Sequence, residues 1–158
     1  MMSIYTVSFF GHRYIYDTFL VEKKLERVIT KLLSKNNYVE FLVGRNGEFD
    51  QIVSSVIRRC KNEVRNDNSA HILILPYVTA EFKNNEDSFF NYYDEIDICP
   101  DSLEKHFKEA HQARNRYMVN KSDLVVFFVK DSKGGAYQTL RYTKKISKRY
   151  INLFEEYN

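Results

Sequence analysis

The sequence predicts an α/β protein: an open, mostly parallel sheet of five strands with helices on both faces. The main observation is one pattern that recurs along the 158 residues. A segment rich in β-branched and aromatic residues runs into a glycine turn, and an amphipathic segment follows, as at residues 4–34. A second observation is the continuously apolar run at 71–75, which is typical of a parallel strand covered on both faces. Right-handed crossovers between such units give an open sheet.

The elements follow in order from these patterns. In the first helix Val21, Leu25, Val28 and Leu32 share one face, and Asp17 or Thr18 is its expected N-cap. Asp101 or Ser102 is expected to cap the third helix, which carries Leu103 on its apolar face. We expect strands at about 4–10, 38–43, 71–75, 123–129 and 150–153, and helices at about 17–34, 49–64, 101–120 and 136–147.

The segment 77–100 has no clean period of 2 or 3.6, and we interpret it as an insertion into a single domain that spans residues 1–158. At most one or two helical turns are expected in it. Loops of this length tend to be lids or interaction surfaces. Its aromatic residues could stack on a base, meet a partner subunit or pack onto their own domain; they are Phe82, Phe89, Phe90, Tyr92 and Tyr93.

Composition bounds the class of protein. With 44% hydrophobic and 15% aromatic residues the chain is globular and long enough to bury a core. Cys60 and Cys99 show no C-x-x-C spacing, so neither a zinc site nor a disulfide framework is implied, and a reducing cytoplasm is the expected compartment. The first residues lack the charged region of a signal peptide. No apolar run reaches the roughly 20 residues of a membrane span, so no membrane association is expected.

Charge is distributed unevenly although the net charge is only +3. Residues 81–109 include nine acidic and three basic side chains, whereas residues 121–149 include eight basic and two acidic ones. One end of the molecule should therefore carry a positive potential, either as a solvated face or as a phosphate-binding one.

The first and third glycine turns are expected to meet in one crevice. In the strand order 3-2-1-4-5 the first and fourth strands are neighbours, and ligands bind outside the carboxyl ends of such strands. Gly11 allows a turn with positive φ, and His12 and Arg13 follow it. Gly134, Gly135 and Ala136, with Lys133 beside them, open a helix whose free N–H groups suit a phosphate. The alternative is a pair of plain loop-closing turns.

The second turn lies next to these two and carries carboxylates. Glu48 and Asp50 follow Arg45 and Asn46 there. A carboxylate at this place could accept hydrogen bonds from ribose hydroxyls, or act as nucleophile or general base toward an anomeric carbon. It could equally be a helix N-terminal acid that interacts with the helix dipole. Arg114 or Arg116, late in the third helix, could also reach the crevice.

Four motifs taken together resemble the SLOG superfamily, which includes the LOG phosphoribohydrolases and the DprA/Smf proteins, and most of all its YpsA-like branch. The motifs are V-S-F-F-G-H-R at 7–13, V-G-R-N-G-E-F-D at 43–50, R-N-R-Y-M-V-N-K-S-D at 114–123 and K-G-G-A-Y-Q-T at 133–139. The resemblance implies a single Rossmann-like domain. It also implies that the ligand is surrounded by Gly11, His12, Arg13, Gly44, Gly47, Glu48, Gly134, Gly135 and Thr139.

The favoured function is binding or sensing of a nucleotide-type small molecule, such as an ADP-ribose or NAD-related compound. The second is an enzyme that cleaves an N-glycosidic bond in a nucleotide. The chain lacks the third glycine and the glutamate of the P-G-G-x-G-T-x-x-E signature of LOG enzymes, so Glu48 would have to be its catalytic group.

The least favoured function is single-stranded nucleic-acid binding like that of DprA. The aromatic residues are concentrated in the acidic insertion, away from the basic segment, while proteins that bind single strands prefer the two kinds of residue interleaved. Nucleic acid is therefore expected to be an unlikely partner. A homodimer is a further possibility by analogy with LOG proteins. No cofactor is expected, and no metal, because His71, His106 and His111 show no metal-ligand grouping.

Overall fold

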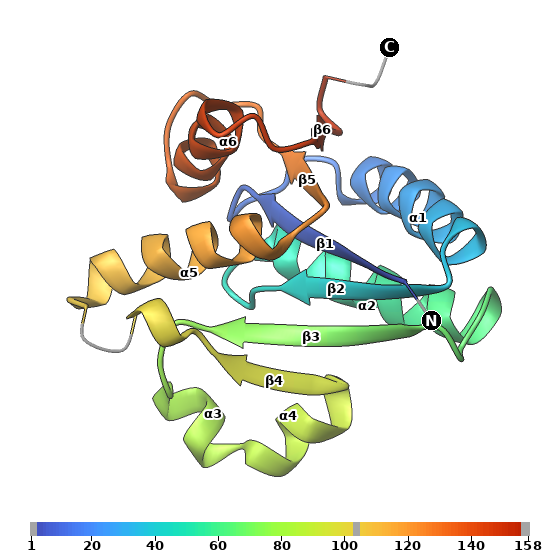
Figure 1. Ribbon diagram of the computed structural model, residues 1–158, viewed down its shortest axis with the longest axis horizontal. Coiled ribbons are helices and arrows are strands. Elements are labelled where there is room, and N and C mark those ends of the chain that lie inside the picture. The colour runs from blue at the N-terminus through green and yellow to red at the C-terminus, as the bar shows by residue number, and fades with distance from the viewer. Residues whose placement is uncertain (1–2, 103–104, 156–158) are drawn as a thin grey trace.

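The computed structural model describes residues 3–102 and 105–155 and contains one parallel sheet flanked by helices (Figure 1). The sheet order is β4-β3-β2-β1-β5-β6, and every neighbouring pair is parallel. Its strands are β1 (Ile4–Gly11), β2 (Tyr38–Val43), β3 (Ser69–Leu75), β4 (Glu95–Ile98), β5 (Leu124–Phe128) and β6 (Tyr150–Asn152). The longer helices are α1 (Thr18–Lys35), α2 (Glu48–Glu63), α5 (Phe107–Lys121) and α6 (Gly135–Lys145).

The expected α/β class and the expected order of five strands are confirmed, but the sheet has six strands. The sixth, β4, lies inside the 77–100 segment and pairs with the outer side of β3, where Ile72 faces Glu95. It has only four residues, with acidic side chains alternating with Ile96 and Ile98, as is common on an exposed edge strand. A run this short gives too little periodicity to stand out in the sequence.

The 77–100 segment is also more helical than expected. It contains α3 (Ala80–Asn84), capped by the Thr79 hydroxyl, and α4 (Glu86–Tyr92). Phe89 and Tyr93 are buried against the sheet, so this segment packs on its own domain.

The start of the third long helix differs from the expectation. Helix α5 begins at Phe107, while Pro100–Ser102 form a short 3-10 turn, η1. The Ser102 hydroxyl is buried and donates to the carbonyl oxygens of Pro76 and Cys99, and the N-cap of α5 is His106 instead. The expected contact of Leu103 lies outside the described residues.

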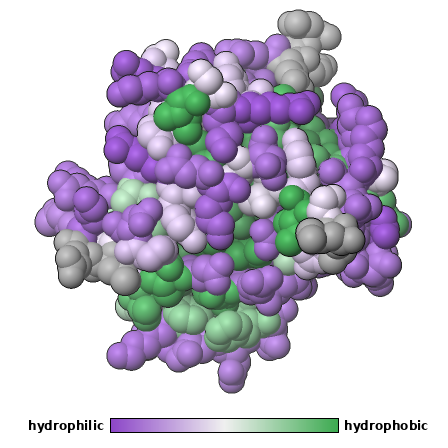
Figure 2. Space-filling view, in the orientation of Figure 1, coloured by the Kyte–Doolittle hydropathy of each residue, from purple (hydrophilic) through white to green (hydrophobic). Residues whose placement is uncertain are grey.

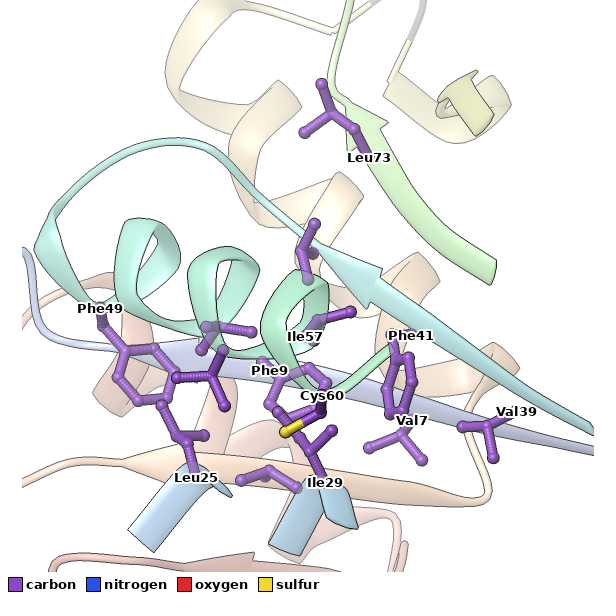
Figure 3. Packing of buried hydrophobic residues seen from close by; sticks show 14 of the residues in the cluster. Val7, Phe9, Leu25, Ile29, Val39, Phe41, Phe49, Ile57, Cys60 and Leu73 are labelled. Atoms are coloured by element: carbon purple, nitrogen blue, oxygen red, sulfur yellow. The ribbon is translucent and has the colours of Figure 1, made fainter. Parts of the chain in front are cut away.

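The two faces of the sheet bury separate hydrophobic clusters. Helices α1 and α2 cover one face, where Phe9, Phe41 and Phe49 are fully buried (Figure 3). Helices α5 and α6 cover the other, around Phe127 and Met118. Figure 2 shows that the molecular surface seen in the orientation of Figure 1 is mostly hydrophilic. Within the described residues no helix is both long and apolar enough to cross a membrane.

Candidate functional site

A crevice of about 580 Å³ opens at the carboxyl ends of β1, β3 and β5. It lies at the place where the winding of the sheet reverses between β1 and β5, the usual ligand position of such folds. The structure brings eight of the predicted site residues to its wall: Gly11, His12, Arg13, Arg45, Arg114, Gly134, Gly135 and Ala136.

The remaining predicted residues do not line this crevice. Gly44 lines a neighbouring cavity, and Glu48 faces a third one between α1 and α2. Lys133 is exposed to solvent, and Thr139 is buried in α6. Gly47 is a backbone element of the second turn.

Gly11 is needed for packing rather than for a positive φ. Among the described glycines only Gly47 and Gly134 have positive φ, at 117° and 94°. A Cβ built on Gly11 would collide with the ring of Phe49, which is fully buried. The absence of a side chain therefore lets the first turn of α2 approach the end of β1.

The second turn is fastened to the first one. The N–H of Glu48 donates to the Arg13 carbonyl oxygen at 2.8 Å, and Gly47 fits against the Arg13 Cα because it has no Cβ. The carboxylate of Glu48 accepts a hydrogen bond from the Ile15 N–H at 2.7 Å. Glu48 thus supports the loop that carries Arg13 and points away from the crevice.

His12 fastens the first turn to the third one. Its Nε2 accepts hydrogen bonds from the N–H groups of Lys130 and Asp131 at 2.8 and 3.0 Å. An acceptor Nε2 requires the neutral ring with its proton on Nδ1. The imidazole therefore positions two loops around the crevice, with Nδ1 as its remaining donor.

The third turn presents backbone groups to the crevice. Gly134 has φ 94° and ψ 174°, a conformation that is essentially restricted to glycine, and it is the N-cap of α6. No side chain caps this helix, and nothing but Gln112 approaches the Cα of Gly135 closely. The first N–H groups of α6, together with the helix dipole, are suited to an anion.

Arg114 and Thr139 belong to a chain of hydrogen bonds behind the crevice. Arg114 donates to the Ile74 carbonyl at 3.0 Å and to the Asn115 side chain at 2.9 Å. Asn115 donates to Thr139, and the Thr139 hydroxyl donates to the Gly135 carbonyl. Burial lowers the pKa of Arg114, while the charge of Asp50 raises it. The chain fixes the end of β3 relative to the third turn.

Asp50, rather than Glu48, is the carboxylate of the second turn that reaches the crevice. Its Oδ2 accepts from the Asn46 N–H at 2.9 Å. A Cβ on Gly44 would lie 2.9 Å from this oxygen and 3.3 Å from Arg114 Nη1, so the two side chains converge on a bare glycine. Burial raises the pKa of Asp50 to about 6, opposed by Arg114 and by the Asn46 hydrogen bond. In the sequence, the only sign that Asp50 could reach a ligand was its position in the first turn of α2.

An aromatic cluster on the crevice wall was missed by sequence reasoning. Tyr77 lies 5.9 Å from Phe107 and 6.0 Å from His111, and the Phe107 and His111 rings are 5.1 Å apart. Phe107 is 58% exposed. These residues come from two segments about thirty positions apart, and neither segment has a pattern that marks it. We call them the aromatic wall.

Further exposed aromatic residues follow Arg13 in the β1–α1 loop and in the first turn of α1. Tyr14, Tyr16 and Phe19 are 80%, 104% and 68% exposed. The Lys23 ammonium lies 5.4 Å from the Phe19 ring centre. This segment therefore offers exposed aromatic rings near the cationic side chains of Arg13 and Lys23.

A second cavity of about 460 Å³ adjoins the crevice, and we call it the side pocket. It lies between the start of α2 and helices α3 and α4, and it shares Arg45, Asp50 and Glu81 with the crevice. Arg45 donates to both carboxylate oxygens of Glu81 at 3.0 and 3.2 Å and to the Tyr93 hydroxyl at 3.0 Å. Its guanidinium also lies 4.2 Å from the Phe89 ring centre. The Arg45–Glu81 pair thus forms the partition between the two cavities.

Charge is segregated across the sheet. The acidic side chains of α3, α4 and β4 lie at the β4 edge, while α6, which carries Arg141, Lys144 and Lys145, lies toward the β6 edge (Figure 1). The crevice lies between these edges. In the described part of the chain, no group of three or more His, Cys, Asp or Glu side chains is arranged to hold a metal ion.

The fold is that of a Rossmann-like protein, with a crevice at the switch point of its parallel sheet. Two solved structures of DNA processing protein A share this fold. DprA from Helicobacter pylori, whose structure describes a single-stranded DNA binding mode, has a TM-score of 0.64 and 18% identity, over 92% of this chain and 63% of that one. DprA from Streptococcus pneumoniae has a TM-score of 0.65 and 15% identity, over 93% of this chain and 49% of that one.

The chain therefore spans less than two thirds of either DprA chain. No protein-family profile matches the sequence, and no curated protein does. The Rossmann-like fold that the SLOG resemblance implied is confirmed by these likenesses, since DprA is one of the proteins named with that superfamily. They do not bear on the YpsA-like branch.

The same comparisons correct the expected function and partners. The expected function was binding of a nucleotide-type small molecule, with N-glycosidic cleavage as the alternative, and it is contradicted. The expectation that nucleic acid is an unlikely partner is contradicted as well. Both structures are of DNA processing proteins, one of them described in a single-stranded DNA binding mode. Nucleic acid was expected to be an unlikely partner because aromatic and basic residues lie apart in the sequence. In the fold, Tyr77 and Phe107 share a crevice with Arg13 and Arg114.

Proposed function

We propose that the chain binds single-stranded nucleic acid in the crevice at the carboxyl ends of its strands. The observation that carries this proposal is the aromatic wall of Tyr77, Phe107 and His111 in the same crevice as Arg13 and the Gly134–Gly135 turn. Proteins that bind single strands combine a cationic groove for the backbone with aromatic rings on which bases stack. The DprA likeness supports the same class of ligand.

Phosphate groups have two places of contact in this proposal. The guanidinium of Arg13 is exposed at the mouth of the crevice, and the N–H groups at the start of α6 face its interior. Both supply donors to an anion without reading the base. Arg114 also lines the crevice and adds positive charge there, while its Nε and Nη1 hold Asn115 and Ile74.

Bases have stacking partners on two sides of Arg13. The aromatic wall is inside the crevice, and the exposed Tyr14, Tyr16 and Phe19 follow Arg13 outside it. Stacking on such rings is worth about 1–3 kcal/mol per base and tolerates any base sequence. We therefore expect little discrimination among sequences from these rings alone.

Fluorescence anisotropy with a labelled oligothymidylate of about 12 nucleotides tests the proposal, since single-strand sites span roughly 4–16 nucleotides. We expect binding whose affinity falls steeply with salt, because each neutralised phosphate contributes about −0.7 to the slope of log K against log salt. A duplex of the same length should bind more weakly. Absence of binding, or binding independent of salt, would overturn the proposal.

Four finer assignments accompany it as proposals. They are a single domain over 1–158 with an insertion at about 77–100, a place in the YpsA-like branch, a cytoplasmic location and a homodimeric state. The packing of the insertion against the β3 edge supports the assignment of a single domain. The four motifs quoted from the sequence support the YpsA-like branch.

A further inference from the structure

We infer that the side pocket is a base-recognition subsite, which accepts one unpaired nucleobase of a strand whose phosphates stay in the crevice. This inference rests on the proposed function and goes beyond it by adding sequence preference. The two cavities share the Arg45–Glu81 partition and Asp50, so a nucleotide bound beside the partition can extend its base across it. The volume of about 460 Å³ falls in the range of small-molecule sites.

The charges of the two cavities divide the nucleotide between them. The side pocket wall carries two carboxylates, Asp50 and Glu81, and one guanidinium, Arg45, whose charge is matched by Glu81. The crevice adds Arg13 and Arg114 to the same three groups. A phosphate is therefore attracted to the crevice and repelled from the side pocket, whereas an uncharged base enters without an electrostatic penalty.

The lining of the side pocket suits a flat heterocycle with polar edges. Phe89, Tyr92 and Tyr93 supply aromatic surface, and the Arg45 guanidinium carbon lies 4.2 Å from the centre of the Phe89 ring. Gln51 and Ser88 supply an amide and a hydroxyl that make no hydrogen bond to any described residue. These groups can both donate to and accept from the edge of a base.

Asp50 sets the expected preference among bases. Its Oδ2 is held by the Asn46 N–H, and its Oδ1 makes no hydrogen bond among the described residues. A carboxylate accepts hydrogen bonds and cannot donate them. Guanine presents two adjacent donors, N1–H and N2–H, whereas thymine presents a single N–H between two carbonyl oxygens that a carboxylate repels. Guanine is therefore the preferred base, and thymine is the least favoured.

The experiment compares an all-thymidine strand with the same strand carrying one central guanosine, and also titrates free guanosine, which lacks a phosphate. We expect the guanosine-containing strand to bind about tenfold more tightly, in line with about 1–3 kcal/mol for a good bidentate contact.

Ser88→Trp fills the pocket from an exposed position of α4. It should bring the ratio of the two strand affinities to one and abolish binding of free guanosine. Asn91→Trp, exposed on the same helix and outside both cavities, should leave them unchanged.

A second variant leaves the pocket open. Asp50→Asn replaces an acceptor with a group that can also donate, so it should reduce the ratio of the two strand affinities toward one, and this ratio is the readout because Asp50 also lines the crevice. All-thymidine binding with no guanosine preference and no guanosine binding would overturn the subsite and leave the proposed function intact. Guanosine binding without strand binding would overturn the proposed function and keep the subsite as a nucleoside site. Failure of both would overturn both.

Discussion

The Glu48 carboxylate accepts a hydrogen bond from the backbone N–H of Ile15 at 2.7 Å, joining the start of α2 to the loop that carries Arg13. This contact gives Glu48 a positioning role. Glu48→Ala removes the acceptor and should lower the free energy of unfolding by about 1 kcal/mol. Glu48→Gln retains an oxygen acceptor and should lose less than half of that. Urea unfolding measures both, and equal losses in the two variants would contradict the role.

Gly11→Ala should be destabilising because the new Cβ collides with the buried ring of Phe49. Overpacking of this kind costs about 1–3 kcal/mol. Adding Phe49→Leu should recover part of the loss relative to the sum of the single variants, since the two residues touch. The matched control is Gly135→Ala, whose Cβ would lie 3.6 Å from its nearest neighbour, Gln112 Nε2. That variant should unfold within about 0.5 kcal/mol of the wild type.

Arg13→Ala should weaken binding of an oligothymidylate and reduce the salt slope by about 0.7, because one phosphate contact to a single strand is removed. Arg27→Ala is the control, since it removes the same charge from an exposed position of α1 outside both cavities. Anisotropy titrations at several salt concentrations measure both slopes. A slope change shared equally by the two variants would indicate a long-range charge effect in place of a contact.

Phe107→Ala should lower single-strand affinity by about tenfold, since base stacking on one ring is worth about 1–3 kcal/mol. The ring is 58% exposed, so its removal should have little effect on stability. Phe90→Ala provides a comparison: Phe90 is 55% exposed but lines neither cavity. If both variants bind as tightly as the wild type, the aromatic wall does not stack bases.

The pH dependence of stability should reveal two buried groups that act in opposite directions. The pKa of Asp50 is raised to about 6 by burial, so protonation favours the folded state and stability is gained as the pH falls from 6 toward 3.8. The pKa of His71 is lowered to about 4 by burial, so stability is full above 6.5 and is lost as the pH falls toward 4. The two effects partly cancel in the wild type.

Asp50→Asn removes only the first effect, so this variant should lose stability more steeply than the wild type between pH 6 and 4. Urea unfolding at several pH values measures the two curves. Asp87→Asn, at an exposed position of α4, should run parallel to the wild type. Parallel curves for Asp50→Asn and the wild type would mean that Asp50 is solvated in the folded protein.

Much of the architecture could be predicted because it depends on local patterns. The apolar run at 71–75 became a strand in which every residue is buried. In α1, Val21 and Leu25 are buried as their spacing indicated, whereas Val28 and Leu32 are only partly buried and Ile29 and Leu33 face the core fully. Strand β4 and helices α3 and α4 could not be predicted, because they are short and owe their stability to packing against β3. The meeting of the Gly11 and Gly134 turns followed from the strand order alone.

The sequence by itself determined the α/β class, the order of the five main strands and the edge of the sheet where a ligand would be met. Hydrophobic periodicity and chain direction are properties of neighbouring residues, so they can be read without coordinates. Only the tertiary structure decided that Asp50 and not Glu48 faces the crevice, and that Tyr77 and Phe107 line it beside Arg13. Those relationships join segments far apart in the chain, and their contacts exist only after the strands have paired and the helices have packed.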